Sequence, residues 1–324
     1  MNQETPLAIV FDPIRSDLQR VEDLLRDAVG STAEPLRGML QHVLTGGKRL
    51  RAAVVVLSGQ SLGGAGQTLA QLAAAVEILH AATLVHDDVV DESATRRGRD
   101  TLHFRWSTQA AVLAGDYLLA QSVRMVTELE RGDILAVLAR TLTAICEGEI
   151  VQALLGDGSR PGRTSYFKQI EAKTAALFRS AAEMAAMLAA GTDAQINALR
   201  RYGLRLGLAY QIVDDVLDIG GRPAELGKPV GMDLRQGLWT LPVLLHLQQA
   251  GPSDPVCAYV AGERTDDMLV QAIDCLFSSG ALDAARAEAA RQARLAQRAV
   301  RALPDTAARD GLLALAECVL TRRA

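Results

Sequence analysis

Hydrophobic and polar positions follow a helical period along most of this chain. Alanine, leucine, glutamate, arginine and glutamine dominate, and no segment shows the sustained two-residue alternation of a half-buried strand. The nearest candidate for a strand, residues 52–57, has helix-like sequence on both sides, and we interpret it as buried helix. The pattern predicts helices at residues 15–29, 33–45, 50–60, 67–91, 107–130, 133–155, 163–190, 193–220, 238–250, 265–279, 281–302 and 306–322.

Four central segments are apolar on nearly all sides, which is typical of helices inside a bundle: residues 67–86, 107–127, 175–191 and 203–217. Stretches with glycine or proline separate the helices, but no linker rich in Pro, Gly or Ser divides the chain. We therefore predict an all-α fold, a single-domain bundle of about a dozen helices around a central cavity, spanning residues 1–324.

Composition narrows the class of protein. The chain has 324 residues and a net charge of -4, which argues against a nucleic-acid binder because such proteins usually carry a basic patch. Its four cysteines are widely spaced and form no CxxC pair, as expected in a reducing compartment. Residues 1–19 lack the pattern of a signal peptide. The most apolar stretch, residues 69–85, is broken by polar residues, so we predict a soluble, cytoplasmic protein without a transmembrane segment.

The pattern Asp-Asp-x-x-Asp occurs twice, at residues 87–91 and 214–218, in strongly helical surroundings. The first and last aspartates of each motif are four residues apart and therefore share a helix face, while the middle one lies about a quarter-turn away. Clustered carboxylates near apolar surface repel each other unless cations neutralise them. Mg²⁺ prefers oxygen ligands that it shares with phosphate. The candidate metal-binding residues are Asp87, Asp88, Asp91, Asp214, Asp215 and Asp218.

Basic residues accompany both motifs. The segment GGKRLR at residues 46–51 combines three cations with two glycines, whose backbone N–H groups can approach an anion. Arg96 and Arg97 follow the first motif, and Lys228 follows the second. Arginine forks match phosphate oxygens. A site with both Mg²⁺ and free cations would bind two diphosphates, one through metal and one directly.

With these motifs the chain resembles a known family, the trans-isoprenyl diphosphate synthases or polyprenyl synthetases. The resemblance covers residues 40–245 with order and spacing preserved, and residues 265–324 add C-terminal helices. The matching strings are GGKRLR (46–51), HAATLVHDDVVDESATRRG (80–98), VLAGDYLLA (112–120), EGEIVQ (147–152), KTAALF (173–178), AYQIVDDVLD (209–218), LGKPVGMDL (226–234) and TLP (240–242).

The resemblance implies a role for each site residue. Three Mg²⁺ ions bound by Asp87, Asp91 and Asp214 would bridge to an allylic diphosphate, with the other three aspartates beside them. The allylic diphosphate oxygens would also be held by Arg96, Lys173 and Lys228. The diphosphate of isopentenyl diphosphate would be held by Lys48, Arg51, His80 and Arg97. The developing allylic cation would be stabilised by Thr174 and Gln211. The resemblance also implies a homodimer.

The implied reaction is head-to-tail prenyl transfer. Mg²⁺ and cationic side chains stabilise charge on the leaving diphosphate, so its C–O bond ionises to an allylic carbocation. The double bond of isopentenyl diphosphate attacks this cation, and loss of a proton completes the cycle.

Some positions depart from the family pattern. Ala52 stands where proline is usual, and Asp100, Leu102 and His103 replace the usual residues after the first motif. Leu238 stands where many members have a lysine near the allylic diphosphate, which predicts a weaker allylic site.

Product length is predicted from the residues just before the first motif. Ala82 and Thr83 are small where short-product members carry aromatic residues, and the motif lacks the two-residue insertion of bacterial short-chain synthases. Both features favour a medium or long all-trans product such as a quinone side chain. By resemblance and helical position, Met125 and Leu138 are candidates for the floor of the product tunnel.

Other functions stay open. The chain could be a short-chain synthase such as a geranylgeranyl diphosphate synthase, or the catalytic subunit of a heteromeric synthase. A class I terpene cyclase shares the first motif but needs only one diphosphate, and it usually lacks a second Asp-Asp-x-x-Asp. A single such motif is more often a solvated acidic face, and Asp266–Asp267 is interpreted only as part of a helix start. His86 is expected to be structural.

Overall fold

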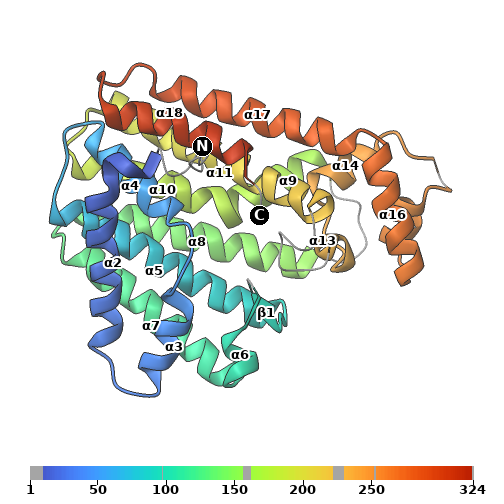
Figure 1. The fold of residues 1–324 in the computed structure, drawn as a ribbon, viewed down its shortest axis with the longest axis horizontal. Helices are drawn as coiled ribbons and strands as arrows, with labels where there is room; N and C mark the ends of the chain where they lie inside the picture. Colours follow the sequence, from blue (N-terminus) through green and yellow to red (C-terminus); the bar gives the residue numbers. More distant parts are fainter. Residues whose placement is uncertain (1–9, 97, 156–161, 222–229, 252, 323–324) are drawn as a thin grey trace, which may run out of the picture. The chain divides into compact units, whose positions relative to one another are not determined.

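The computed structural model describes residues 10–96, 98–155, 162–221, 230–251 and 253–322, although only the backbone of residues 153–155. Helices form nearly all of its regular structure (Figure 1). Within the described ranges the strands are limited to one two-residue pair, Thr95–Arg96 (β1) and Arg99–Asp100 (β2), which run antiparallel. The predicted all-α fold with about a dozen substantial helices is confirmed.

The chain divides into two compact units. The first comprises residues 1–143, 177–203 and 299–315. Its elements are η1 (Asp12–Ile14), α2 (Arg15–Gly30), α3 (Leu36–Leu44), α4 (Leu50–Gln60), α5 (Gln67–Val90), β1, β2, α6 (Leu102–Arg105), α7 (Thr108–Thr127) and parts of α8 (Gly132–Leu155), α10 (Ala176–Leu188), α11 (Asp193–Gly220), α17 (Ala281–Val300) and α18 (Ala307–Leu320).

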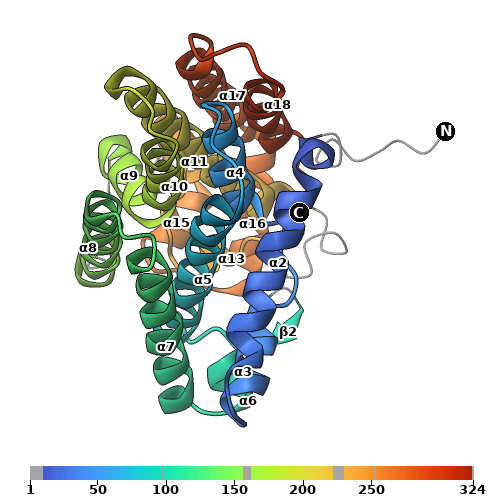
Figure 2. The same cartoon turned by 90° about the vertical axis from the view of Figure 1, so that its left-hand side faces the viewer.

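Helix α5 is the core of this first unit. It contacts α7, α4 and α2, and Figure 2 shows it between α7 and α2. Its side chains from Leu69 to Val85 are buried on nearly all sides, and many of them are alanines that let neighbouring helices approach closely. By length and composition α5 could cross a membrane, but 72% of its most apolar window is buried inside the chain. It is therefore the core helix of a globular fold.

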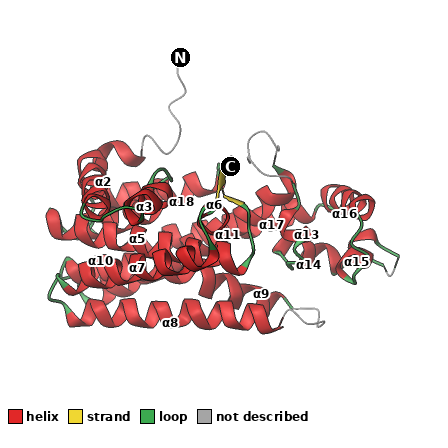
Figure 3. Cartoon of the chain, turned by 90° about the horizontal axis from the view of Figure 1, so that it is seen from below, coloured by secondary structure: helices red, strands yellow, loops and turns green. Residues whose placement is uncertain are grey.

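The second unit comprises residues 144–176, 204–298 and 316–324. Besides the remaining parts of α8, α11, α17 and α18 it holds α9 (Arg163–Ile170), the π-helix η2 (Glu171–Ala175), α13 (Met232–Arg235), α14 (Leu241–Leu247), α15 (Pro255–Val260) and α16 (Asp266–Ser278). Helix α14 contacts α9, α15 and α16, and Figure 3 shows α13 to α16 gathered together.

Every predicted helix has an observed counterpart, and most ends agree within three residues. Residues 52–57 are buried helix within α4, as interpreted. The predicted helix 163–190 differs, because residues 171–175 form a π-helix between α9 and α10. The hairpin and the short helices α6, α13 and α15 were not predicted. The boundaries between the units fall inside helices, and the single domain stays a prediction.

Candidate active site

The first aspartate motif lies at the carboxyl end of α5. Asp87 and Asp88 belong to the last turn of the helix, and Asp91 is its C-cap residue. Asp87 is half-buried and Asp91 is exposed, whereas Asp88 turns inward and is only 7% exposed. The two carboxylates that share a helix face are thus the ones that solvent reaches.

The inward carboxylate is held by an arginine from the hairpin that follows the helix. The Nε of Arg96 donates to Oδ1 of Asp88 at 2.6 Å. Burial raises the pKa of Asp88, and the positive charge and hydrogen bond of Arg96 offset part of this effect. Arg96, predicted to hold an allylic diphosphate, therefore already contacts the first motif.

His86, the neighbour of the motif, packs against α7. Its Nε2 lies 3.2 Å from the carbonyl oxygen of Val112 and 3.4 Å from Oδ1 of Asp116. Gly115 makes the close approach possible, because a Cβ at this position would lie 2.3 Å from the same nitrogen. These contacts agree with the structural role expected for His86.

The GGKRLR segment forms a left-handed turn before α4. Gly46 and Gly47 have φ angles of 84° and 97°, and Arg49 has a φ of 48° that non-glycine residues rarely adopt. Lys48 is exposed within this turn. Arg51, in the first turn of α4, is 8% exposed, and its guanidinium lies 4.5 Å from the ring centre of Phe178.

The structure brings this segment to the turn of α5 that carries His80. The backbone N–H of Ala52 donates to Oε1 of Glu77 at 2.9 Å, and Glu77 is three residues before His80. Positions three apart are neighbours on a helix surface. Three of the residues predicted to bind isopentenyl diphosphate, Lys48, Arg51 and His80, therefore belong to two adjoining turns.

The second motif lies within α11, and its middle aspartate is held by neutral groups. Asp215 is 3% exposed. The hydroxyl of Tyr166 donates to its Oδ2 at 2.6 Å, Nε2 of Gln211 donates to its Oδ1 at 2.9 Å, and the backbone N–H of Leu241 also donates. Burial raises the pKa of Asp215 to about 7, although the hydrogen bonds of Tyr166 and Gln211 offset part of the shift.

The π-helix η2 contains two of the three residues predicted to be catalytic. Lys173 and Thr174 both lie in η2, and π-turns of this kind often occur at functional sites. The hydroxyl of Thr174 donates to Oε1 of Gln211 at 2.6 Å, so that Thr174, Gln211 and Asp215 form one chain of hydrogen bonds. Lys173 Nζ lies 3.2 Å from Oε2 of Glu149.

The outer aspartates of the second motif have different surroundings. Asp218 is 1% exposed, and its Oδ2 accepts the backbone N–H of Asp233 at 3.0 Å. The side chain of Asp214 is 44% exposed, and one of its oxygens lies 3.1 Å from the guanidinium of Arg322. That guanidinium also lies 4.0 Å from the ring centre of Tyr210. Asp214 is thus the carboxylate of this motif that solvent reaches.

These carboxylates fit a hard divalent cation that keeps open coordination positions. Among the described residues no three His, Cys, Asp or Glu side chains converge as a closed metal site. Mg²⁺ is usually held by one or two carboxylates and completes its shell with water and substrate phosphate. Asp87, Asp91 and Asp214 provide such accessible carboxylates, and the more deeply buried aspartates are occupied by protein donors.

Three of the predicted product-length residues, Ala82, Met125 and Leu138, are buried in the first unit, and Thr83 is half-buried. Ala82 is 2% exposed, and the hydroxyl of Thr83 donates to the carbonyl of His80 at 2.9 Å. The carbonyl of Met125 accepts a hydrogen bond from Gln71 at 2.9 Å, which places Met125 beside the start of α5. Gln71 precedes Asp87 by 16 residues (87 − 71), or about 24 Å of helix. Leu138 on α8 is 1% exposed.

Two predicted site residues, Arg97 and Lys228, lie outside the described residues. In contrast, the structure shows contacts that the sequence analysis missed, those of Tyr166, Arg49, Glu77 and Arg322. Glu77 did leave a signal, because it is an acid inside the apolar run 69–85, and a buried charge needs a partner. The other three left none, because their partners are distant in sequence.

Comparison with known proteins gives a consistent result. The sequence pattern of the family described as polyprenyl synthetase matches residues 33–276. Octaprenyl diphosphate synthase of Haemophilus influenzae is 36% identical over 93% of this chain and 92% of that protein. The chain belongs to the polyprenyl synthetase family. The predicted prenyltransferase class is confirmed with it.

Other relatives differ in the product that their names state. A short chain isoprenyl diphosphate synthase of Methanothermobacter thermautotrophicus is 33% identical over 97% of this chain and 98% of that protein. Heptaprenyl diphosphate synthase component 2 of Geobacillus stearothermophilus is 38% identical over 80% of this chain and 81% of that protein. A crystal structure of polyprenyl synthase from Caulobacter crescentus, complexed with calcium and isoprenyl diphosphate, superposes with a TM-score of 0.93 at 37% identity, covering 98% of both chains.

Proposed function

We propose that this polyprenyl synthetase condenses isopentenyl diphosphate with an allylic diphosphate to give a long all-trans polyprenyl diphosphate. The observation that carries the proposal is the family match together with both aspartate motifs intact and accessible at Asp87, Asp91 and Asp214. The octaprenyl synthase relative supports a long product.

In this proposal the aspartates differ in their tasks. Asp87, Asp91 and Asp214 bind Mg²⁺, three ions in all, and the calcium in the Caulobacter structure supports a divalent cation. Asp88, Asp215 and Asp218 position the motifs through their protein partners. When bound, Mg²⁺ neutralises charge on the leaving diphosphate and so favours ionisation of its C–O bond.

The remaining residues bind substrate or orient the reacting groups. Lys48, Arg51 and His80, together with Arg97, bind the diphosphate of isopentenyl diphosphate directly. The allylic diphosphate is held by Arg96, Lys173 and Lys228. Thr174 and Asp215 fix the amide of Gln211, whose oxygen carries partial negative charge and can stabilise the allylic cation.

Product length depends in this proposal on the depth of the space beside α5. Ala82 and Thr83 leave room below the first motif, and Met125 and Leu138 lie further along as the floor. Ala82→Phe should shorten the products, while Met125→Ala and Leu138→Ala should lengthen them, as measured by radio-TLC of the dephosphorylated products. Unchanged product lengths in all three folded variants would remove this assignment.

The test of the proposed function is an assay of the purified chain alone with Mg²⁺, farnesyl diphosphate and labelled isopentenyl diphosphate. We expect incorporation of label into products longer than geranylgeranyl diphosphate. Geranylgeranyl diphosphate as the end product would instead indicate a short-chain synthase. Release of a cyclic hydrocarbon without isopentenyl diphosphate would indicate a terpene cyclase.

A heteromeric synthase is the second candidate, because a relative at 38% identity is named component 2 of a heptaprenyl diphosphate synthase. Inactivity of the chain alone, restored by a second polypeptide, would favour it.

We propose instead a homodimer that uses the exposed apolar side chains Phe104, Val112 and Leu113 of α6 and α7. Light scattering should show a dimer that Leu113→Asp converts to monomer.

We place the enzyme in the cytoplasm. Its four cysteines form no disulfide, as is usual in a reducing compartment, and its most apolar helix is buried within the fold.

A further inference from the structure

Helix α4 begins without a capping side chain of its own. Its N-cap residue is Arg49, in left-handed conformation, and no side-chain cap bond is made there. The first N–H groups of a helix have no partner within the helix and need one elsewhere. Glu77 of α5 supplies it, because its Oε1 accepts the N–H of Ala52 at 2.9 Å although the two residues are 25 positions apart.

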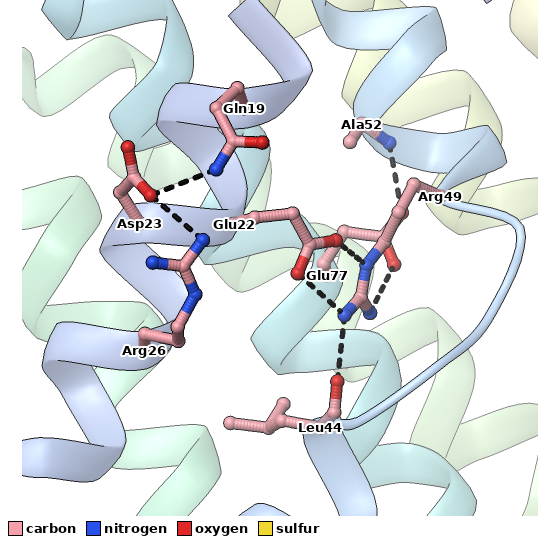
Figure 4. A network of polar contacts seen from close by, with 8 residues as sticks. All are labelled: Gln19, Glu22, Asp23, Arg26, Leu44, Arg49, Ala52 and Glu77. Carbon is pink, nitrogen blue, oxygen red and sulfur yellow. Dashed lines mark hydrogen bonds and ion pairs between the residues drawn. The ribbon is translucent and has the colours of Figure 1, made fainter.

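Arg49 joins the same carboxylate to two further elements (Figure 4). Its Nε donates to Oε1 of Glu22 on α2 at 2.5 Å, and its Nη2 donates to the carbonyl of Leu44, the last residue of α3, at 2.7 Å. Its Nη1 lies 3.8 Å from Oε2 of Glu77. One guanidinium thus connects the GGKRLR turn to α2, α3 and α5.

The network is mostly withdrawn from solvent. The side chain of Arg49 is 14% exposed and that of Glu77 is 7% exposed. Charges at such positions interact strongly, and removal of one partner leaves the other buried and uncompensated. The arrangement therefore has one favoured geometry, which fixes the turn against α5.

The residues beside this network are those proposed to bind isopentenyl diphosphate. Lys48 precedes Arg49, Arg51 precedes Ala52, and His80 lies three residues after Glu77. We infer that Arg49 and Glu77 are positioning residues that set the relative places of Lys48, Arg51 and His80 without contacting substrate themselves. The inference rests on the proposed function of these three residues.

The test separates the two substrates. Glu77→Gln keeps an acceptor oxygen for the N–H of Ala52 but removes the negative charge that faces Arg49. Arg49→Lys keeps the positive charge but loses the planar guanidinium that can donate several hydrogen bonds at once. We expect each to raise the KM for isopentenyl diphosphate on the order of tenfold to a hundredfold, because small misplacement of binding groups has effects of this size. The KM for the allylic diphosphate should stay within twofold.

Asp23→Asn is the matched control. Asp23 lies next to Glu22 on α2, but its partners Gln19 and Arg26 belong to the same helix (Figure 4). This variant should keep both KM values. Ala52→Pro is the mildest variant, because the first turn of a helix tolerates proline and only one N–H is lost. It should raise the KM for isopentenyl diphosphate a few-fold.

A binding experiment provides a readout that does not depend on turnover. Calorimetric titration of the folded variants with isopentenyl diphosphate in EDTA should show weaker binding for Glu77→Gln and Arg49→Lys than for wild type and Asp23→Asn. If Lys48→Ala and Arg51→Ala lose binding while Glu77→Gln and Arg49→Lys retain it, the positioning role is wrong and the proposed site stands. If Lys48→Ala and Arg51→Ala bind normally, the proposed site itself is wrong. An equal rise of the KM values for both substrates, with a lower melting temperature, would show that the network contributes only to the general stability of the fold and would overturn the inference.

Discussion

The two aspartate motifs have the same five-residue pattern but hold their middle carboxylate in different ways. In the first motif a cation holds Asp88, since Arg96 reaches it at 2.6 Å from the adjoining hairpin. In the second, neutral donors from three elements hold Asp215, namely Tyr166, Gln211 and the backbone of Leu241. Burial raises the pKa of both Asp88 and Asp215, and the two motifs differ in the groups that offset this rise.

In both motifs the first aspartate is accessible and the middle one is buried, but the last one is exposed in the first motif and buried in the second. The five-residue pattern therefore specifies neither the exposure of every carboxylate nor how a buried one is satisfied. A paired arginine offsets the charge of Asp88, whereas Asp215 depends on hydrogen bonds alone. The second motif should therefore be more sensitive to pH and to the loss of one neutral neighbour. Variants that alter one motif at a time test this comparison.

The largest effects are expected from the accessible carboxylates of both motifs. Asp87→Ala and Asp214→Ala should each lower kcat by at least about a hundredfold to a thousandfold, because in the proposed function each removes a ligand of the metal that would stabilise charge in the transition state. Steady-state assays with labelled isopentenyl diphosphate measure this, and circular dichroism checks the fold. A near-normal rate in either variant would contradict its metal assignment.

Tyr166→Phe should have the next largest effect. It leaves Oδ2 of Asp215 without its hydroxyl donor, which should cost about 1–3 kcal/mol of folding stability and lower kcat. Denaturant unfolding and steady-state kinetics measure both. Tyr117→Phe is the control, since that hydroxyl is bonded only to Gln121 on the same helix among the contacts that the structure shows. Equal losses in the two variants would refute a special role for Tyr166.

The pH dependence of stability should differ between the motifs. In the unfolded chain an aspartate has a pKa of about 3.9, so the folded protein, with Asp215 at about 7, holds this proton more tightly. The resulting stabilisation is fully present below pH ~4 and is lost as the pH rises through about 7. Melting temperatures of the metal-free protein in EDTA should therefore fall less steeply over this range in Asp215→Asn than in wild type.

Asp88→Asn is the internal comparison for this experiment. This variant should change the slope of melting temperature against pH less than Asp215→Asn does, because Arg96 already offsets part of the pKa rise that burial causes in Asp88. Coinciding curves for the two variants would show that the two motifs do not differ in this respect.

The smallest effect is expected from Arg322→Ala. The Arg322 guanidinium lies 3.1 Å from Asp214 and would compete with the proposed Mg²⁺ for that carboxylate. The Asp214 side chain is 44% exposed and solvent screens the pair, so the Mg²⁺ concentration for half-maximal rate should fall only roughly twofold to fivefold. Initial rates across a Mg²⁺ titration measure this, and an unchanged midpoint would show that the pair does not oppose metal binding.

Much of the fold could be predicted because long helices leave a clear period in the sequence. Helices α4, α5 and α11 were predicted to within one residue at each end. The motif residues could be proposed as a site because they are adjacent in sequence, and their roles stay predictions. The partners of Asp215 and of Glu77 could not, since Tyr166 lies 49 residues from Asp215 and Ala52 lies 25 from Glu77. Such pairs depend on tertiary packing, which a local pattern does not encode.

The five-residue π-helix η2 has a consequence for redesign of this chain. A π-turn holds one residue more than an α-turn, and each residue added to or removed from a helix rotates its N-terminal part by about 100° relative to its C-terminal part. Deletion of Glu171 or Ala172 would avoid this rotation, because four residues in an α-turn rotate about as far as five in the π-turn, so Tyr166 would stay directed at Asp215 and Thr174 would stay beside Gln211. The π-turn thus absorbs one extra residue without changing the phase of the flanking helices, and chimaeras joined within it tolerate the loss of one residue there but not of two.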